Sequence, residues 1–253
     1  QFFTKKVREH FKKSPPHEIE ISLNGMTRAT YEGIVRVPGA FHKVISTIYF
    51  LKKNNINFLI KCTGLRQNAG EIILLAQFAR KLFGNVYSRK FVFSPLLVCG
   101  QKNQKGPRSA RLPVPEVVKC LSLDGNIGLM ENRGECQGSQ LSSGREQHLY
   151  RCFRWLKSAF IDPFGQMGFC QICNDYSFDI GKKSIHEIFY SELPRIEKVS
   201  YQTNSQCRAC ALKDYCYKCP VIAKLENGNK ESPVQYFCDL AERLREHRFV
   251  GRK

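Results

Sequence analysis

Apolar residues recur with two alternating periods over the first 98 residues of the chain. Apolar positions three or four residues apart predict an amphipathic helix, and alternation of apolar with polar positions predicts a strand. Helices are expected at the start of the chain and at 27–34, 39–54 and 68–83, and strands at 17–23, 55–63 and 86–93. Strands and helices that alternate at this spacing predict right-handed crossovers and a parallel sheet.

Three parallel strands amount to about half of a (β/α) barrel, in which chemistry takes place at the C-terminal ends of the strands. Those ends are residues 22–24, 61–63 and 94–95. Half a barrel leaves an open sheet edge, and the first helix begins without a Ser, Thr, Asp or Asn cap. We therefore expect Gln1 to lie inside an element and the chain to be the C-terminal piece of a longer polypeptide. A natural or trimmed frayed terminus is the alternative.

The periodic pattern weakens between residues 99 and 148. Gly, Pro, Ser, Gln and basic residues dominate there, and short apolar pieces remain only at 117–121 and 127–130. This composition predicts a linker with little regular structure. Cysteines become frequent after it. The expected organisation is thus a strand–helix domain at 1–98, a linker at 99–148 and a cysteine-rich module at 149–253.

The charge of the chain is strongly basic, with a net value of +18 over 253 residues. Such a charge can attract nucleic acid, an anionic cofactor or an acidic peptide, or be a solvated surface without a specific partner. No nucleic-acid motif or aromatic stacking pattern accompanies it. The absence of an 18-residue apolar run and of a signal peptide predicts no membrane span and a cytoplasmic location, where thiols stay reduced.

Two groups of cysteines carry the candidate chemistry. Their spacing is Cys152-x12-Gly165-x4-Cys170 in the first, and Cys207-x2-Cys210-x5-Cys216-x2-Cys219-Pro220 with a distal Cys238 in the second. Thiolates bunched in this way, without secretory features, predict bound metal. Zinc sites usually separate their two Cys-x2-Cys pairs by more than the five residues found here. Iron–sulfur sites accept dispersed thiolates and often place Pro after the last Cys, so the spacing favours them but leaves zinc open.

With this spacing, the cysteine module resembles the SPASM domain of radical S-adenosylmethionine (SAM) enzymes. That pattern is a Cys, nine to fifteen residues, a Gly, four residues and a Cys, followed by Cys-x2-Cys-x5-Cys-x3-Cys and a distal Cys; this chain has x2 before Cys219. Residues 161–165 (IDPFG) resemble the family's IDPxG turn. Residues 21–25 (ISLNG) resemble its ISLDG strand end, with Asn24 in place of Asp. The resemblance covers about residues 1–98 and 149–245.

The resemblance implies an α/β fold, in which the C-terminal half of a partial parallel (β/α) barrel precedes a small iron–sulfur domain. It implies two auxiliary [4Fe–4S] clusters. Cys152, Cys170 and Cys219 would hold the first, with Cys173 or a substrate thiolate as the fourth ligand. Cys207, Cys210, Cys216 and Cys238 would hold the second. The remaining cysteines are expected to be structural; they are Cys62, Cys99, Cys120 and Cys136.

The resemblance also implies an S-adenosylmethionine site at the strand ends, where Ser22, Asn24 and Lys61 are the candidate residues. A hydroxyl that satisfies backbone is the competing interpretation of Ser22, and a helix cap explains Asn68 without chemistry. The Cys-x3-Cys-x2-Cys motif that cleaves S-adenosylmethionine in this family does not occur in the chain. Any such activity is therefore expected of the intact parent protein.

The function implied is that of a radical SAM enzyme that modifies a peptide or protein through a 5′-deoxyadenosyl radical. Its expected partners are that substrate and a reductant such as a flavodoxin or ferredoxin, with nucleic acid and membrane unlikely. One alternative is a zinc-binding, basic module that binds nucleic acid. Another is a non-catalytic fragment or degenerate paralogue that keeps the clusters for folding or partner binding.

Overall fold

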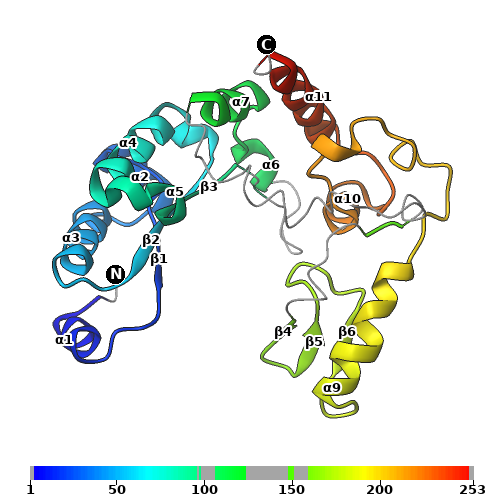
Figure 1. Ribbon diagram of the computed structural model, residues 1–253, viewed down its shortest axis with the longest axis horizontal. Coiled ribbons are helices and arrows are strands. Elements are labelled where there is room, and N and C mark those ends of the chain that lie inside the picture. The colour runs from blue at the N-terminus through cyan, green and yellow to red at the C-terminus, as the bar shows by residue number, and fades with distance from the viewer. Residues whose placement is uncertain (1–2, 96, 98–105, 124–147, 151–158, 251–253) are drawn as a thin grey trace. The chain divides into compact units, whose positions relative to one another are not determined.

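The computed structural model describes residues 3–95, 97, 106–123, 148–150 and 159–250. The chain divides into two compact units (Figure 1). Gln1–Leu97 and Arg108–Glu131 form the first unit, and Val98–Pro107 and Asn132–Lys253 form the second. Each unit has its own sheet and its own buried core, so the two are described in turn.

The first unit alternates helices with the strands of one sheet. Its elements in chain order are α1 (Lys5–Lys13), β1 (Ile19–Ser22), α2 (Arg28–Val35), α3 (Ala40–Lys53), β2 (Phe58–Thr63), the 3₁₀ turn η1 (Arg66–Glu71), α4 (Ile72–Phe83), the 3₁₀ turn η2 (Gly84–Val86), α5 (Tyr87–Lys90), β3 (Phe91–Ser94), α6 (Gly106–Ala110) and α7 (Val114–Leu123). This order confirms the predicted α/β class of the unit.

The predicted parallel sheet is confirmed. Its strand order is β1–β2–β3, and both pairs are parallel. Alternate residues point to opposite faces of a strand. One face is therefore apolar: Phe58, Ile60, Cys62, Phe91 and Phe93 are buried on it, and Ile19 and Ile21 of β1 are partly buried. The opposite face, which is exposed or partly exposed, carries the polar side chains.

Two boundaries in the first unit differ from the sequence prediction. The first helix begins at Lys5, and Thr4 is its N-cap, since its hydroxyl accepts a hydrogen bond from Val7 N at 3.4 Å. The inference that this helix lacks a cap was wrong, because apolar spacing extended the predicted helix through the cap. Strand β3 begins at Phe91 instead of 86, because residues Tyr87–Lys90 form the short helix α5. The ring of Tyr87 stacks on that of Phe91, with ring centroids 5.7 Å apart.

The segment expected to be an irregular linker contains helices α6 and α7. Helix α7 buries Val117, Val118 and Cys120, so a short apolar run that looked isolated in the sequence belongs to the core of the first unit. Arg111 precedes it, donates to the carbonyl of Leu97 at 2.8 Å and pairs with Leu65 in a β-bridge. Long-range contacts, which local composition does not record, stabilise these helices.

The second unit contains a small antiparallel sheet and short helices. Its elements are β4 (Phe160–Ile161), β5 (Gln166–Gly168), β6 (Ser177–Asp179), α9 (Ile185–Glu187), the π-helical turn η5 (Ile188–Glu192), the 3₁₀ turns η6 (Leu193–Lys198) and η7 (Lys213–Tyr215), α10 (Pro220–Asn227) and α11 (Gln235–Val250). The sheet order is β4–β5–β6, with both pairs antiparallel.

The turn between β4 and β5 follows from its sequence. Asp162 accepts hydrogen bonds from Phe164 N and Gln166 N through its Oδ1 atom, at 2.8 and 2.9 Å. Gly165 has φ of 78°, a left-handed conformation that glycine adopts without steric strain. An Asp followed three residues later by Gly thus builds the hairpin that leads toward Cys170.

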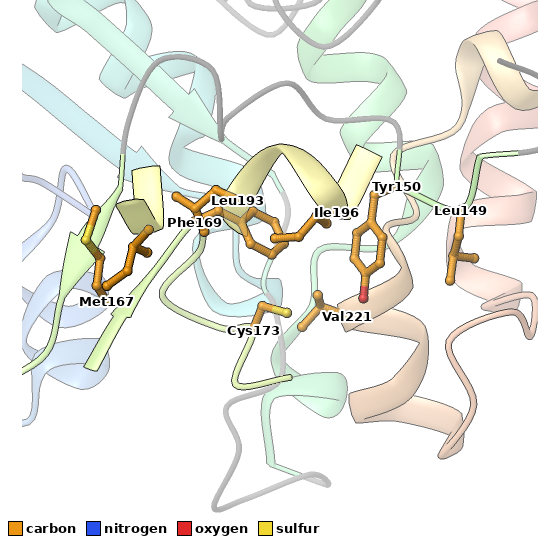
Figure 2. Close-up of a cluster of buried hydrophobic side chains, with 9 residues drawn as sticks. Leu149, Tyr150, Met167, Phe169, Cys173, Leu193, Ile196 and Val221 are labelled. Carbon is orange, nitrogen blue, oxygen red and sulfur yellow. The ribbon is translucent and has the colours of Figure 1, made fainter. Parts of the chain in front are cut away.

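The core of the second unit gathers residues from distant parts of its sequence. Nine buried residues form it: Leu149, Tyr150, Met167, Phe169, Cys173, Ile188, Leu193, Ile196 and Val221. Figure 2 shows Cys173 and Tyr150 within this cluster, on either side of Val221 from α10. Helix α10 begins at Pro220, directly after Cys219, and the core therefore lies against two cysteines of the predicted metal groups. Throughout the described residues, every helix is too short or too polar to cross a bilayer.

Candidate cofactor and metal sites

The exposed face of the parallel sheet brings two of the three predicted cofactor residues together. Ser22 on β1 is paired in register with Lys61 on β2, so both side chains lie on this face. Ser22 is exposed, while the ammonium of Lys61 lies 3.1 Å from the carboxylate of Glu20 on the same face. A hydroxyl, an ammonium and a carboxylate therefore stand side by side near the C-terminal ends of β1 and β2.

Asn24 has a structural role at the end of β1. Its Oδ1 atom accepts a hydrogen bond from Thr63 N at 2.9 Å, and its carbonyl accepts one from Asn68 Nδ2 at 2.9 Å. The first bond joins the loop after β1 to Thr63, the last residue of β2, and the second joins it to η1. The side-chain oxygen of Asn24 thus fixes the shape of the strand ends, in addition to any contact with a cofactor.

Asn68 was expected to cap the helix that follows it, and that assignment was wrong. The residue lies inside η1 and is fully buried. Its side chain donates to the carbonyls of Asn24 and Thr63, both at 2.9 Å, and accepts from Leu65 N at 2.8 Å. One amide group therefore holds three backbone segments at the mouth of the sheet.

Glu71 is a residue of the same mouth that the sequence analysis missed. Its carboxylate accepts hydrogen bonds from Met26 N at 2.6 Å, Thr27 N at 3.1 Å, Thr27 Oγ1 at 2.7 Å and Thr30 Oγ1 at 2.6 Å. Partial burial opposes ionisation, but these donors outweigh it and hold the pKa of Glu71 below its ordinary value. Glu71 thereby fixes the loop after β1 from 45 residues away in the sequence.

The ligands predicted for the first cluster, among them Cys170, Cys173 and Cys219, lie around the core of the second unit. Cys173 is buried, its N–H donates to the carbonyl of Cys170 at 3.0 Å, and Cys170 and Cys219 both pack against the core. Burial raises the pKa of the Cys173 thiol, although a backbone N–H from Asp175 acts against that rise. The fourth residue of this group, Cys152, lies outside the described residues.

The four ligands predicted for the second cluster are spread over 32 positions, from Cys207 to Cys238. Burial raises the pKa of the Cys216 thiol, and the charges of Cys238, Cys207 and Cys210 raise it further. The pKa of Cys238 is raised by burial and by Cys207 and Cys210 in the same way. Electrostatic influence of this kind falls off with distance, and the assignment of these four thiols to one cluster remains a prediction.

Backbone N–H groups point at several of these sulfur atoms. Leu212 N lies 3.4 Å from Cys210 Sγ, and Ile222 N lies 3.4 Å from Cys219 Sγ. The N–H of Lys218 donates to the Cys216 sulfur, and that of Asp175 donates to the Cys173 sulfur. Donors aimed at a sulfur favour its thiolate form, which is the form that binds metal.

The donor chemistry fits a thiolate-bound centre, but the sulfur atoms do not converge on one point. No three His, Cys, Asp or Glu side chains within the described residues are grouped so that they could hold a metal ion. A single zinc ion requires all ligands within about 2.3 Å of one centre. An iron–sulfur cluster binds each thiolate at a different iron, and its ligands therefore stand further apart.

Two further cysteines form a separate pair in the first unit. Cys62 on β2 and Cys120 on α7 are both buried. Burial, with a smaller contribution from Cys120, raises the pKa of Cys62 to about 12, and burial together with Glu116 raises that of Cys120 to about 11. Cys99 and Cys136, which were also expected to be structural, lie outside the described residues.

Several solved structures share this fold. The structure of anSMEcpe with bound AdoMet has a TM-score of 0.60 at 15% identity, covering 98% of this chain and 70% of that one. The structure of anSMEcpe with AdoMet and the Kp18Cys peptide has a TM-score of 0.55 at 15% identity, covering 98% and 71%. SuiB from Streptococcus suis bound to S-adenosylmethionine has a TM-score of 0.59 at 15% identity, covering 94% and 57%. No protein-family model and no curated protein matches the chain.

These likenesses define the class of fold to which the chain conforms. It is a mixed α/β fold shared with these AdoMet-bound structures, and in this chain it contains a three-stranded parallel sheet. Identities of 15% show a shared fold and leave the chemistry to be argued from the residues.

Proposed function

We propose that this chain is part of a radical SAM enzyme that modifies a peptide or protein. In this proposal the parallel sheet is the C-terminal half of a partial (β/α) barrel, and residues 149–253 are a SPASM domain with two auxiliary [4Fe–4S] clusters. The carrying observation is that Cys216 and Cys238 are each influenced electrostatically by Cys207 and Cys210, in a chain with the fold of AdoMet-bound neighbours. The SPASM assignment and both clusters rest on this combination.

The ligand assignment follows the two groups of thiols. Cys170, Cys173 and Cys219 would hold the first cluster together with Cys152, and Cys207, Cys210, Cys216 and Cys238 would hold the second. A bound cluster supplies one-electron redox chemistry or an iron to which substrate can bind. The chain's own contribution is to aim backbone N–H groups at the sulfur atoms of Cys210 and Cys219, and to pack the core of the second unit around Cys170, Cys173 and Cys219.

The S-adenosylmethionine site is proposed at the exposed face of the parallel sheet. Ser22 and Lys61 offer a hydroxyl and an ammonium there, and both can orient a polar ligand. Asn24 and Asn68 hold the two strand ends in register, and Glu71 holds the adjoining loop. The cofactor supplies the radical chemistry, while these residues bind and orient it.

A peptide or protein is the proposed substrate. One neighbour with the same fold, anSMEcpe, was solved with the bound peptide Kp18Cys and also with Cp18Cys. The reductant is proposed to be a flavodoxin or ferredoxin, and the cytoplasm is the compartment in which such thiols stay reduced. A zinc-binding nucleic-acid module is not favoured by any observation on the described residues.

The proposal is tested by the metal content of protein purified without oxygen. Two auxiliary clusters give about eight irons and eight sulfides per chain of residues 1–253, with absorbance near 400 nm. Cys210→Ala removes one proposed ligand of the second cluster and is expected to lose about half of the iron. Cys62→Ala is the matched control, since its thiol is buried in the first unit, and it is expected to keep all of it.

Either of two results would contradict the proposal. One is a colourless protein with one or two zinc ions, which would support the zinc-binding alternative. The other is an unchanged iron content in Cys210→Ala, which would show that this thiol is not a ligand.

A further inference from the structure

Three buried polar side-chain atoms in the described part of the chain have no hydrogen-bond partner. They are Arg8 Nε, Tyr150 Oη and Lys218 Nζ. A buried polar atom without a partner costs free energy, and in a native protein it calls for an explanation such as an ion or group that is bound there. Arg8 lies in the first unit, where its guanidinium donates to Ser46 Oγ and lies over the ring of Phe50. The other two atoms lie in the second unit, each beside one cysteine group.

Lys218 lies within the second cysteine group. It stands in the chain between Cys216, a ligand proposed for the second cluster, and Cys219, one proposed for the first, and its own N–H donates to the Cys216 sulfur. The positive charge of its ammonium acts on Cys238 and on Glu231. No hydrogen bond joins Lys218 to Glu231, whose carboxylate accepts from Gln202 N at 2.6 Å and from the N–H and hydroxyl of Thr203. The buried ammonium therefore has no hydrogen-bonded anion, and its charge acts on Cys238.

Tyr150 lies within the first cysteine group. Tyr150 is only 3% exposed. Burial raises the pKa of its hydroxyl, and the charges of Cys173 and Cys219 are among those that raise it further. Edge-to-face contacts with Phe169 and Tyr176, at centroid distances of 5.9 and 5.7 Å, fix the orientation of the ring. Figure 2 shows the ring of Tyr150 with its hydroxyl end beside Val221 of α10. A hydroxyl held in this way has a fixed direction but no acceptor.

We propose that Lys218 Nζ donates a hydrogen bond to a sulfur atom of the second auxiliary cluster, and Tyr150 Oη to one of the first. Each donor thereby sets the reduction potential of its cluster. This inference rests on the proposed function, because it requires both clusters to be bound. A cluster with four thiolates is anionic, and its negative charge grows when it accepts one electron. Hydrogen bonds to sulfur and nearby positive charge stabilise the reduced form and raise the potential.

The two donors differ in charge, and the difference has a consequence for the clusters. Lys218 supplies a full positive charge and a hydrogen bond, whereas Tyr150 supplies a neutral hydrogen bond. The second cluster, beside Lys218, is therefore reduced at the higher potential of the two. Both side chains act as positioning residues, since their effect is exerted through the clusters.

The test is a reductive titration, followed by electron paramagnetic resonance, of the wild type and of matched variants purified without oxygen. Lys218→Met is expected to lower the equilibrium constant for reduction of one cluster at least tenfold, which is about 59 mV for a one-electron couple. The reduction potential of the first cluster is expected to stay unchanged. Tyr150→Phe is expected to lower only the potential of the first cluster, and by a smaller amount.

Two controls isolate the charge from the side chain. Lys218→Arg keeps the positive charge and is expected to keep a potential near that of the wild type. Lys182→Met removes the same charge from a side chain that is 82% exposed, and it is expected to change neither cluster. Iron and sulfide are measured for each protein before titration, so that loss of a cluster is distinguished from a change in its potential.

Each outcome decides between the two proposals or overturns one of them. A wild type without iron overturns the proposed function. A wild type with about eight irons, and variants with full iron but unchanged potentials, overturn this inference alone. If Lys218→Met loses the second cluster and Lys218→Arg keeps it, the requirement for a positive charge is supported. Loss of the cluster in both variants overturns the role of charge.

Discussion

At the scale of single residues, the mouth of the parallel sheet depends on side chains that bond to backbone. Asn68 and Glu71 both lie in η1, and together they hold the residues that follow β1 and β2. Their effect is to fix the backbone beside Ser22 and Lys61, the candidate residues for the cofactor. A site made at strand ends requires such supporting residues, because a free loop end is mobile.

Replacing Asn68 is expected to destabilise the first unit. Asn68→Ala leaves the N–H of Leu65 and the carbonyls of Asn24 and Thr63 without this partner. Each buried group left unsatisfied costs about 1–3 kcal/mol, so a loss of about 3 kcal/mol is expected in urea unfolding. Gln67→Ala, an exposed position in the same turn, is expected to change stability by less than about 0.5 kcal/mol. Equal effects of the two variants would contradict the role given to Asn68.

At the scale of elements, the short strands of the second unit depend on close packing. Their sheet has only two or three residues in each strand, and its hairpin is fixed by Asp162 and Gly165. Gly168 on β5 lies where a side chain has no room. A Cβ atom there would stand 2.9 Å from Phe160 Cε1 and 3.0 Å from the carbonyl oxygen of Tyr176.

Gly168→Ala is therefore expected to destabilise the second unit. The added methyl group must displace the ring of Phe160 and the backbone at Tyr176, and such overpacking costs about 1–3 kcal/mol. Thermal unfolding of the variant measures the loss. Gly70→Ala is the matched control, because a Cβ atom at Gly70 meets nothing within 4 Å. A Gly168→Ala variant as stable as this control would show that β4 and β5 are not packed as described.

At the scale of the whole molecule, the two units have different sources of stability. The first buries one apolar face of its sheet beneath helices. The second has a core in which Cys173 takes part and against which Cys170 and Cys219 pack. If clusters bind there, their binding free energy is also folding free energy of that unit.

Removing the clusters is expected to loosen only the second unit. Hydrogen exchange before and after treatment with an iron chelator measures this, because exchange reports local opening. Protection is expected to fall in α10 and in the β4–β6 sheet, and to stay unchanged in β1, β2 and β3. A uniform fall over both units would contradict separate stabilisation, and no fall anywhere would contradict a structural role for the clusters.

The order of elements in the first unit could be predicted from sequence because each of them has a strong local period. Ile19 and Ile21 mark β1, and the apolar positions of 40–53 mark α3, as the structure confirms. Local period did not place α7 or α5, because contacts with distant elements outweigh the propensity of those short segments. Asn68 shows the same limit. Its place before an apolar helix is typical of a helix cap, but in the structure it is buried and its side chain bonds to three backbone groups.

What the sequence by itself determined is the chemistry on offer: the spacing of the cysteines, the polar residues at the ends of alternating strands and the parallel order of those strands. These follow from local pattern and from the type of each residue. Only the tertiary structure decided which groups are neighbours. It placed Ser22 beside Lys61, let Cys238 influence Cys216 electrostatically, and buried Lys218 Nζ and Tyr150 Oη without hydrogen-bond partners. Such proximity and burial arise from packing between segments far apart in the chain, which no local period encodes.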